Sequence, residues 1–521
     1  MSTGTMISGR RRPGTDMRSM VTTLVLATAG TLALGLFALN DQSLWTDELG
    51  TWRLTVADSW RDWLMQLITW PNSDSQIPLF HLYMRAWTQV FPSTEVWMRA
   101  ANLPWVFVAL IGVLTTPVPA AQRRLVLIFG AVLLLHPMVW YYTNEARPYA
   151  MLFAGSCFAG SGLLARMVLE SDSSRLPDAN GRLIAGVAIM AGTSVLGVIW
   201  SIAFLLPVLG TLRRRADPSL AAAAQISFGN VVLALACGLM LLPVGYHYAW
   251  TALHGISATN YYENSLANFA FGLYEIAGFS GIGPGREELR TVGAAGLTGW
   301  LIPLTAYGIV VAAVIAVGLR ASLDRNRRQT MLVLMSAFIP LGVLFVLGAL
   351  KHWRVVGRHM MPLVVFFSLY LSFGLDALLR MSAWNLGGYL RRALAGVTLA
   401  AMAFSSIDLA YAKRHRREDF RSAAGMAASY LERNDRVWWA AYLWGASYYH
   451  LPFVHPSMCE SAGSQAAILL ESPDSSQLAD CPEPQIIFIG RNDTEGSVHR
   501  YAAEHHFHRV ASLTGFEIFG K

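Results

Sequence analysis

Two acidic segments carry side chains that could do chemistry beside a membrane. Asp47 and Glu48 directly follow the first long apolar run of the chain. Such acids can cap or hydrate a helix end, and a carboxylate in this position can also deprotonate an acceptor hydroxyl. Glu145 and Arg147 stand between two later apolar runs. Because charge at a membrane edge is costly, this second segment indicates either a functional site or an internal ion pair that fixes a turn.

A third segment, residues 351–359, is rich in potential cations, which are Lys351, His352, Arg354, Arg358 and His359. Arginine binds phosphate oxygens through its planar fork, so this segment could cradle an anion, or it could contact headgroups of the outer leaflet. Further cations predicted on the same side are His81, Arg85 and Arg99. A lipid substrate that carries a phosphate would explain both the acids and the cations, because the cations would stabilise the phosphate as a leaving group.

The composition indicates that these segments belong to a membrane protein. The 521 residues are 54% hydrophobic and 14% charged, whereas a soluble globular chain has about 25% charged residues. The net charge of +7 comes from short arginine clusters between apolar runs, as membrane topology requires. This arrangement argues against a soluble enzyme and against a nucleic-acid-binding protein.

The apolar runs predict a polytopic α-helical membrane protein with about 11 transmembrane helices. We expect them near 21–39, 100–119, 125–142, 149–168, 183–196, 198–211, 227–247, 299–319, 330–349, 360–379 and 392–410. Residues 183–211 could instead form one long tilted helix. With two helices there and a cytoplasmic N-terminus, the inner loops hold most arginine clusters, which include Arg123, Arg124, Arg213, Arg214, Arg215, Arg327, Arg328, Arg391 and Arg392. This follows the positive-inside rule, with the basic segment 413–417 as the one exception.

The predicted domains are a basic N-terminus, residues 1–20, a transmembrane catalytic domain, residues 21–411, and an extracytoplasmic α/β domain, residues 412–521. The first outer loop, 40–99, contains two amphipathic segments, 59–69 and 78–90, which we expect to form helices along the membrane surface. In the last domain, 436–442 and 485–490 are expected as strands, 498–506 as a helix and 509–519 as a strand pair. Cys459 and Cys481 could form a disulfide if this domain faces an oxidising compartment.

The order of these features resembles the GT-C superfamily, in particular the branch of protein O-mannosyltransferases and the lipid A aminoarabinose transferase. Asp47-Glu48 matches the outer Asp-Glu pair of that branch, and Arg99 matches its arginine at the second span. Residues 144–149 are close to its Gln-Glu-Ala-Arg-Pro-Tyr element, with Asn144 in place of the glutamine. Residues 76–81 stand where relatives have a segment of the type His-Pro-Pro-Leu-Gly-Lys, but His81 replaces the lysine. The resemblance covers residues 20–210 well and 300–380 by pattern only.

The resemblance implies an inverting transferase that takes a sugar from undecaprenyl or dolichyl phosphate on the extracytoplasmic face of a bacterial inner membrane. It implies Asp47 as the general base, Glu48 as a residue that orients the base or the acceptor, and Glu145 as the second-loop acid. Arg147, Arg99 and Arg358 would contact the donor phosphate. His81 could supply one hydrogen bond, and His352 and Arg354 would add to the phosphate site.

Several alternatives remain open at this stage. No metal is predicted to be required, although Asp47, Glu48 and Glu145 could hold a divalent ion. The acceptor could be a protein, a lipid or a polysaccharide. A transporter or flippase of lipid-linked sugars would share many spans and outer charges, but its functional groups would be expected at broken helices near mid-membrane. A membrane anchor for the C-terminal domain would leave Asp47 and Glu145 unexplained.

Overall fold

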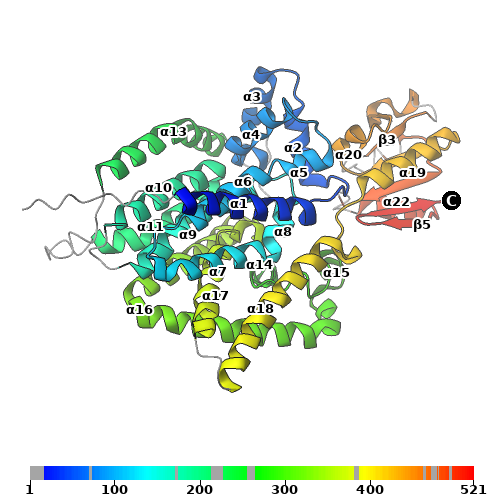
Figure 1. The fold of residues 1–521 in the computed structure, drawn as a ribbon. Helices are drawn as coiled ribbons and strands as arrows, with labels where there is room; N and C mark the ends of the chain where they lie inside the picture. The colour runs from blue at the N-terminus through cyan, green and yellow to red at the C-terminus, as the bar shows by residue number, and fades with distance from the viewer. Residues whose placement is uncertain are drawn as a thin grey trace, which may run out of the picture.

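The structure is a computed structural model that describes residues 17–69, 73–169, 174–212, 227–254, 264–380, 386–461, 465–470, 478, 480–491 and 496–521. A body of helices carries a smaller domain of strands and helices at one end (Figure 1). The basic residues 10–12 and 213–215, on which part of the orientation prediction depends, lie outside the described residues.

The helices of the body follow the predicted spans. They are α1 (Met17–Ala38), α5 (Glu95–Ala100), α6 (Leu103–Leu114), α7 (Arg123–Leu134), α8 (Pro137–Thr143), α9 (Tyr149–Val168), α10 (Leu176–Thr193), α11 (Val195–Leu212), α13 (Phe228–Leu253), α16 (Leu301–Leu350), α17 (Leu363–Arg380) and α18 (Leu386–Tyr411). Within the described residues, seven helical stretches are long and apolar enough to cross a membrane, or eight when the pair formed by α7 and α8, bent by 56°, counts as one span. The polytopic helical fold predicted from the sequence is thus confirmed.

Two breaks decide how the longer runs divide. Residues 183–211 form two helices, because Ser194 has extended φ/ψ angles and separates α10 from α11. The 50-residue helix α16 is interrupted at Asn326, whose φ of −151° is not helical, so its apolar halves can each span the bilayer. The breaks at Ser194 and Asn326 both agree with the spans expected from the sequence. The break at Ser194 gives the two helices at 183–211 that the predicted alternation of inner and outer loops requires.

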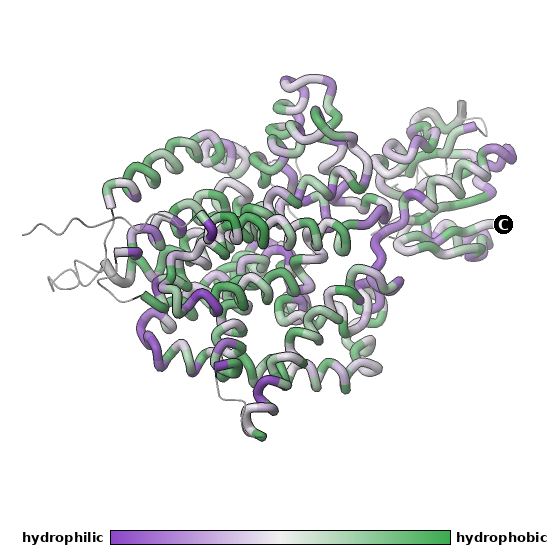
Figure 2. Tube along the Cα trace, in the orientation of Figure 1, coloured by the Kyte–Doolittle hydropathy of each residue, from purple (hydrophilic) through white to green (hydrophobic). Residues whose placement is uncertain are grey.

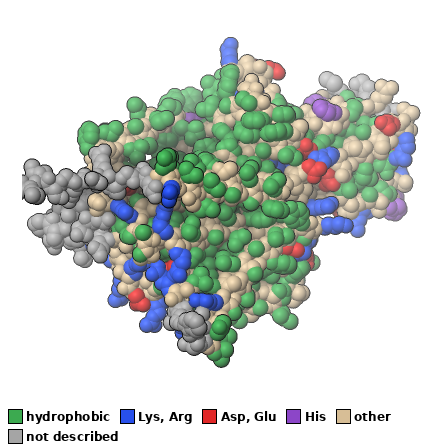
Figure 3. All heavy atoms as spheres, in the orientation of Figure 1, with side chains coloured by type: hydrophobic (Ala, Val, Ile, Leu, Met, Phe, Trp, Pro, Cys, Tyr) green, Lys and Arg blue, Asp and Glu red, His purple; other side chains and the backbone are tan. Residues whose placement is uncertain are grey.

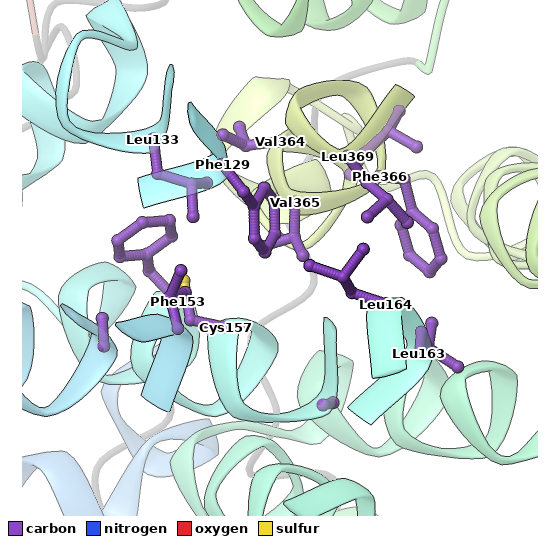
Figure 4. Packing of buried hydrophobic residues seen from close by; sticks show 14 of the residues in the cluster. Phe129, Leu133, Phe153, Cys157, Leu163, Leu164, Val364, Val365, Phe366 and Leu369 are labelled. Atoms are coloured by element: carbon purple, nitrogen blue, oxygen red, sulfur yellow. The ribbon is translucent and has the colours of Figure 1, made fainter. Parts of the chain in front are cut away.

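Small residues let the central helices pack closely. A Cβ added at Gly186 of α10 would lie 2.4 Å from the backbone nitrogen of Ala159 in α9, and one at Gly155 would lie 2.9 Å from the carbonyl oxygen of Gly186. Glycine at such contacts is typical of helices that associate inside a membrane. Figure 4 shows the neighbouring core, in which Phe129 of α7, Phe153 of α9 and Val365 of α17 interlock.

The exterior of the body is apolar. Leu235, Met240 and Leu242 of α13 are 69%, 78% and 63% exposed, and hydrophobic side chains cover most of the visible surface of the body (Figure 3). Figure 2 shows hydrophilic segments mainly at the two ends of the body, one of them at the junction with the C-terminal domain. A continuous apolar exterior of this size is expected for a surface in contact with lipid.

The first outer loop contains more helices than the sequence predicted. They are α2 (Thr46–Thr55), α3 (Trp60–Thr69), the short η1 (Ser73–Gln76) and α4 (Pro78–Thr88). The predicted amphipathic helices 59–69 and 78–90 correspond to α3 and α4. Helix α2 was missed, because its sequence has little amphipathic character and its residues are buried by contacts with other segments.

Several short helices complete the body near the C-terminal domain. They are α14 (Leu266–Ile276), α15 (Arg286–Val292), η4 (Gly293–Trp300), η5 (Gly357–Met360) and η6 (Lys413–His415), whereas η2 (Ala120–Gln122) lies at the other end of the body, where Gln122 contacts Arg380. Of these, η5 and the chain that follows η6 supply side chains to the site described below.

The C-terminal domain is an α/β domain, as predicted. Its sheet has the order β2-β3-β1-β4-β6-β5, in which β2, β3, β1 and β4 are parallel and β6 is antiparallel to β4 and β5. The strands are β1 (Val437–Ala440), β2 (Phe453–Val454), β3 (Ala467–Leu469), β4 (Ile486–Gly490), β5 (His508–Leu513) and β6 (Phe516–Gly520), and the helices are α19 (Phe420–Glu432), α20 (Leu443–Tyr448), η7 (Pro456–Ser461) and α22 (Ser497–Glu504). Cys459 and Cys481 form the predicted disulfide, with their Cα atoms 5.3 Å apart.

Candidate active site

The acids singled out in the sequence meet at the end of the body that carries the C-terminal domain. Asp47 and Glu48 lie in the first turn of α2, and Glu145 lies in the turn between α8 and α9. Arg358 of η5 reaches Asp47 with an Nη1–Oδ2 distance of 2.5 Å, although 311 residues separate them. The loops that hold Asp47, Glu145 and Arg358 were all predicted to face outward. Their approach agrees with that prediction, because an even number of predicted spans separates each of these loops from the next.

Glu48 is held by Arg99 in a buried ion pair. The side chains of both residues are 0% exposed, and Arg99 donates from Nε to Oε1 at 2.9 Å and from Nη2 to Oε2 at 2.6 Å. The remaining donors of Arg99 reach the carbonyl oxygens of Asn40, Gln42 and Ser43. Although burial opposes ionisation, Arg99 lowers the pKa of Glu48. Arg99 therefore has no donor left for a phosphate, contrary to the contact that the sequence suggested, and it anchors the Asp-Glu motif.

Glu145 is buried in a less complete environment. Its side chain is 1% exposed, and the nearest cation is Arg417, whose Nη2 lies 3.4 Å from Oε2. Neither carboxyl oxygen has a hydrogen-bond partner among the described residues. Burial raises the pKa of Glu145 to about 7. A carboxyl group with this pKa exchanges a proton near neutral pH, which structural carboxylates with full hydrogen bonding do not do.

A fourth acid, Asp74 of η1, was not recognised in the sequence. It accepts a 2.6 Å hydrogen bond from Nη1 of Arg147, and Nε2 of His81 lies 3.3 Å away. Although burial alone would raise it, Arg147 and His81 lower the pKa of Asp74. The same Nη1 of Arg147 also reaches the carbonyl oxygen of Asp47 and the hydroxyl of Thr51, each at 3.2 Å. Arg147 therefore fixes α2 against η1.

His81 does not occupy a position from which it could bind the donor. Its ring is 0% exposed and lies against Asp74, and burial lowers the pKa of His81, which favours the neutral imidazole. The single hydrogen bond to phosphate that the sequence suggested for this residue would need a rearrangement of α4. His81 is thus an internal support of Asp74.

Among these carboxylates, Asp47 is the one with substantial access to solvent. Its side chain is 26% exposed and that of its partner Arg358 is 25% exposed, whereas those of Glu48, Glu145 and Asp74 are at most 10% exposed. The Arg358 guanidinium also lies over the Trp45 ring at 5.9 Å. The exposed pair consequently forms the face of the cluster that a substrate can reach.

The other predicted cations lie on the loop between α16 and η5. His352 is exposed and adopts a left-handed backbone conformation with φ of 49°, and Arg354 is half-buried. Burial, together with Arg358 and Arg354, lowers the pKa of His359, so this histidine is neutral. Arg354 and His352 lie close in sequence to Arg358, on the chain that leads to it.

Tyrosines and a further ion pair surround the acids on the side of α14 and α15. Tyr141 stands between two guanidinium groups, those of Arg286 at 4.0 Å and Arg417 at 4.5 Å from its ring centre. Arg286 also binds Glu275 and the hydroxyl of Tyr142. Figure 3 shows acidic and basic side chains at the junction of the body with the C-terminal domain. These partners were missed, because nothing in their local sequence links them to Glu145.

Among the described residues, no group of three or more His, Cys, Asp or Glu side chains converges as it would to hold a metal ion. The acids considered for a divalent ion, Asp47, Glu48 and Glu145, each face an arginine.

Of the comparisons with known proteins, only the one with solved structures found a match. No family model and no curated sequence matches the chain. Two solved structures of ArnT from Cupriavidus metallidurans match along nearly the whole length. The apo form has 14% identity and a TM-score of 0.53, and the form bound to undecaprenyl phosphate has 13% identity and a TM-score of 0.52. Both alignments cover 96% of this chain and 98% of that chain. The chain therefore has the fold of these two ArnT structures.

Proposed function

We propose that this protein is a membrane glycosyltransferase that moves a sugar from a polyprenyl phosphate to an acceptor hydroxyl on the extracytoplasmic face. The observation that carries the proposal is the pair formed by Asp47 and Arg358, which is the accessible part of an otherwise buried cluster of acids and arginines. The solved structure with undecaprenyl phosphate, which shares this fold, supports a lipid phosphate as the donor.

The ion pair suggests how donor binding would prepare the base. The Arg358 guanidinium binds the Asp47 carboxylate. The donor phosphate is a diester with two non-bridging oxygens and one negative charge, so it offers the Arg358 guanidinium a two-oxygen site like that of a carboxylate and would compete with Asp47 for Arg358. Once Arg358 binds the phosphate, the Asp47 carboxylate is free to accept a proton. The general base is thus unmasked when the donor arrives.

The transfer step follows from these positions. Asp47 takes the proton of the acceptor hydroxyl, and the acceptor oxygen forms a bond to the anomeric carbon from the face opposite the phosphate. The bond between that carbon and the phosphate oxygen breaks, and the electron pair leaves with the polyprenyl phosphate, whose charge Arg358 stabilises. The configuration at the sugar carbon is inverted, and Asp47 holds the proton at the end of the step.

The neighbouring residues act by holding Asp47 in place. Glu48 is fully buried and paired with Arg99, so it orients α2 and does not touch the acceptor. Arg147 holds the carbonyl oxygen of Asp47. Arg354 adds positive charge near Arg358 for the phosphate, and His352 could donate a hydrogen bond to it. We predict that no metal is required, and turnover should then persist in a chelator.

The test uses full-length protein in lipid nanodiscs with a panel of undecaprenyl- and dolichyl-phosphate sugars. Asp47→Asn should lower turnover by about 10²–10⁴-fold with donor binding retained, since only the base is lost. Arg358→Ala should weaken donor binding by about 10–150-fold, which corresponds to a charged hydrogen bond of about 1.5–3 kcal/mol. Asp58→Asn is the matched control for Asp47→Asn, because Asp58 lies in the same first outer loop and is exposed. It should have wild-type activity.

Three outcomes would count against this function. Near-normal turnover by Asp47→Asn excludes Asp47 as the base. An unchanged donor affinity in Arg358→Ala refutes the phosphate contact. Movement of an intact lipid-linked sugar across liposomes, without transfer to any acceptor, would favour the transporter alternative.

A further inference from the structure

The chain between the last span and the C-terminal domain runs through the cluster of acids. Helix α18 ends at Tyr411 and α19 begins at Phe420. Between them, Arg417 and Glu418 are 9% and 5% exposed, although both residues are charged. This segment overlaps the basic residues 413–417, the exception to the positive-inside pattern. Buried charges on a connector need partners, and the partners here belong to the candidate active site.

Arg417 lies between the two buried glutamates. Its Nη1 is 3.4 Å from Oε1 of Glu48 and its Nη2 is 3.4 Å from Oε2 of Glu145. It also donates to the carbonyl oxygen of Tyr141 at 3.2 Å. Two buried carboxylates this close to one cation would repel each other without it. Arg417 is thus the cation that Glu48 and Glu145 share.

Glu418, the next residue, holds the helix that carries Asp47. Its Oε2 accepts hydrogen bonds from the backbone nitrogen of Thr46 at 3.2 Å and from the Thr46 hydroxyl at 2.7 Å. Thr46 is the first residue of α2, where a negative charge is favoured by the free N–H groups and the helix dipole. Arg491, which directly follows β4, binds Oε1 of Glu418 at 3.0 Å. Glu418 therefore ties the C-terminal sheet to the start of α2.

The C-terminal domain also holds the chain that enters α2. The Tyr449 hydroxyl accepts a hydrogen bond from the backbone nitrogen of Leu44 at 2.9 Å and lies 3.0 Å from the Ser43 hydroxyl. Arg421 donates to the carbonyl oxygen of Asp41 at 2.6 Å. Contacts on both sides of the Asp-Glu motif leave it little freedom once the domain is docked.

We propose that Arg417 and Glu418 are positioning residues of the active site, through which the docked C-terminal domain sets the geometry of Asp47, Glu48 and Glu145. The domain is then part of the catalytic unit, not an appendage for binding alone. The inference rests on the proposed transferase function for its kinetic consequence, while the ion-pair arrangement can be tested without any activity.

The first test replaces Arg417 in the full-length protein in nanodiscs. Arg417→Gln should lower kcat on the order of 100-fold, because displacement of the acids misaligns the base, while the KM for the donor changes by less than about threefold. Arg417→Lys keeps one positive charge and should recover part of kcat. Arg416→Gln is the matched control, since Arg416 is the preceding residue and is exposed; it should behave as wild type. Glu418→Gln should also lower kcat, but by less than Arg417→Gln does.

The second test follows the melting temperature from about pH 5 to about pH 9 and needs no substrate. The charged groups that act on Glu145 are Arg417, Glu48, Arg358 and Asp47, and those on Arg417 include Tyr141 and Arg286. Without Arg417 the pKa of Glu145 should rise above its present value of about 7. The pH at which the melting temperature of Arg417→Gln falls should therefore be higher than in wild type. A role in folding alone would lower the melting temperature equally at every pH.

The outcomes separate the two proposals. A normal kcat in Arg417→Gln, or a loss matched by Arg416→Gln, overturns the positioning role. An unchanged pH dependence of the melting temperature overturns the ion-pair arrangement. If no donor supports transfer by the wild type, the proposed function fails, and the pH dependence alone decides whether Arg417 joins the two glutamates.

Discussion

Loss of the Arg99 guanidinium should destabilise the protein far more than loss of the Asp47 charge. In Arg99→Met the side chain keeps much of its length, but the buried Glu48 loses the closer of its two arginines and keeps only Arg417, at 3.4 Å. Removing one member of a buried pair costs about 3–5 kcal/mol. The carbonyl oxygens of Asn40, Gln42 and Ser43 lose their donor as well. At about 1.36 kcal/mol per tenfold change, the folding equilibrium should fall by about two to four orders of magnitude.

The measurement is reversible unfolding in mixed micelles, followed by tryptophan fluorescence. Asp47→Asn serves as the comparison, because its pair with Arg358 is about one-quarter exposed and such pairs contribute about 0–1 kcal/mol. The double variant Glu48→Gln with Arg99→Met should recover part of the stability, because the buried charge is then removed together with its partner.

The reasoning would be refuted if Arg99→Met unfolded within about 1 kcal/mol of wild type, since an anchoring buried pair cannot be lost at so small a cost. It would also be refuted if Asp47→Asn were as unstable as Arg99→Met. In either case Arg99 would have to be reconsidered as a residue that meets the substrate.

Two further predictions concern pH and the disulfide. Burial raises the pKa of Glu145 from its ordinary 4.5 to about 7, so the folded protein binds this proton more tightly than the unfolded chain does. Proton binding by Glu145 therefore adds about 3 kcal/mol to the free energy of unfolding. This stabilisation is complete below about pH 4.5 and is lost as the pH rises through about 7. Glu145→Gln should remove this part of the pH dependence of the melting temperature, and parallel curves for variant and wild type would contradict it. The Cys459–Cys481 disulfide closes a separation of 22 residues, so Cys481→Ser should cost about 3 kcal/mol in the C-terminal domain; labelling of both thiols in unreduced wild type would show instead that the bond does not form.

The parts of this protein that depend on local sequence were predicted well. A bilayer of fixed thickness demands about 20 apolar residues in a row, so α1, α9 and α17 could be located from composition alone. The strands β1 and β4 are short apolar runs bounded by polar residues, and they lie within the predicted segments. The helix α2 was missed, because its burial comes from contacts with Asp74 and with the C-terminal domain.

The identity of most acids was also readable from the sequence, since charged residues are rare in an apolar chain and the Asp-Glu and Glu-Ala-Arg-Pro-Tyr motifs stand out. Their partners were not. Arg99 and Arg358 looked equivalent as phosphate ligands, yet Arg99 is fully occupied by Glu48 whereas Arg358 is accessible. Burial and donor geometry, which only the folded chain defines, distinguish the two.

The sequence by itself determined that the chain crosses the membrane many times and that acids and arginines lie at one end of its helices. Only the tertiary structure decided which cation neutralises which acid, because those pairs join residues 51 to 369 positions apart, as Arg99 with Glu48 and Arg417 with Glu48 show. Coulomb energy depends on distance in space and on burial, and neither is encoded in the local pattern that reveals a helix or a strand. For this reason Arg417, one member of a basic segment that looked misplaced, is recognised as part of the site only in the folded protein.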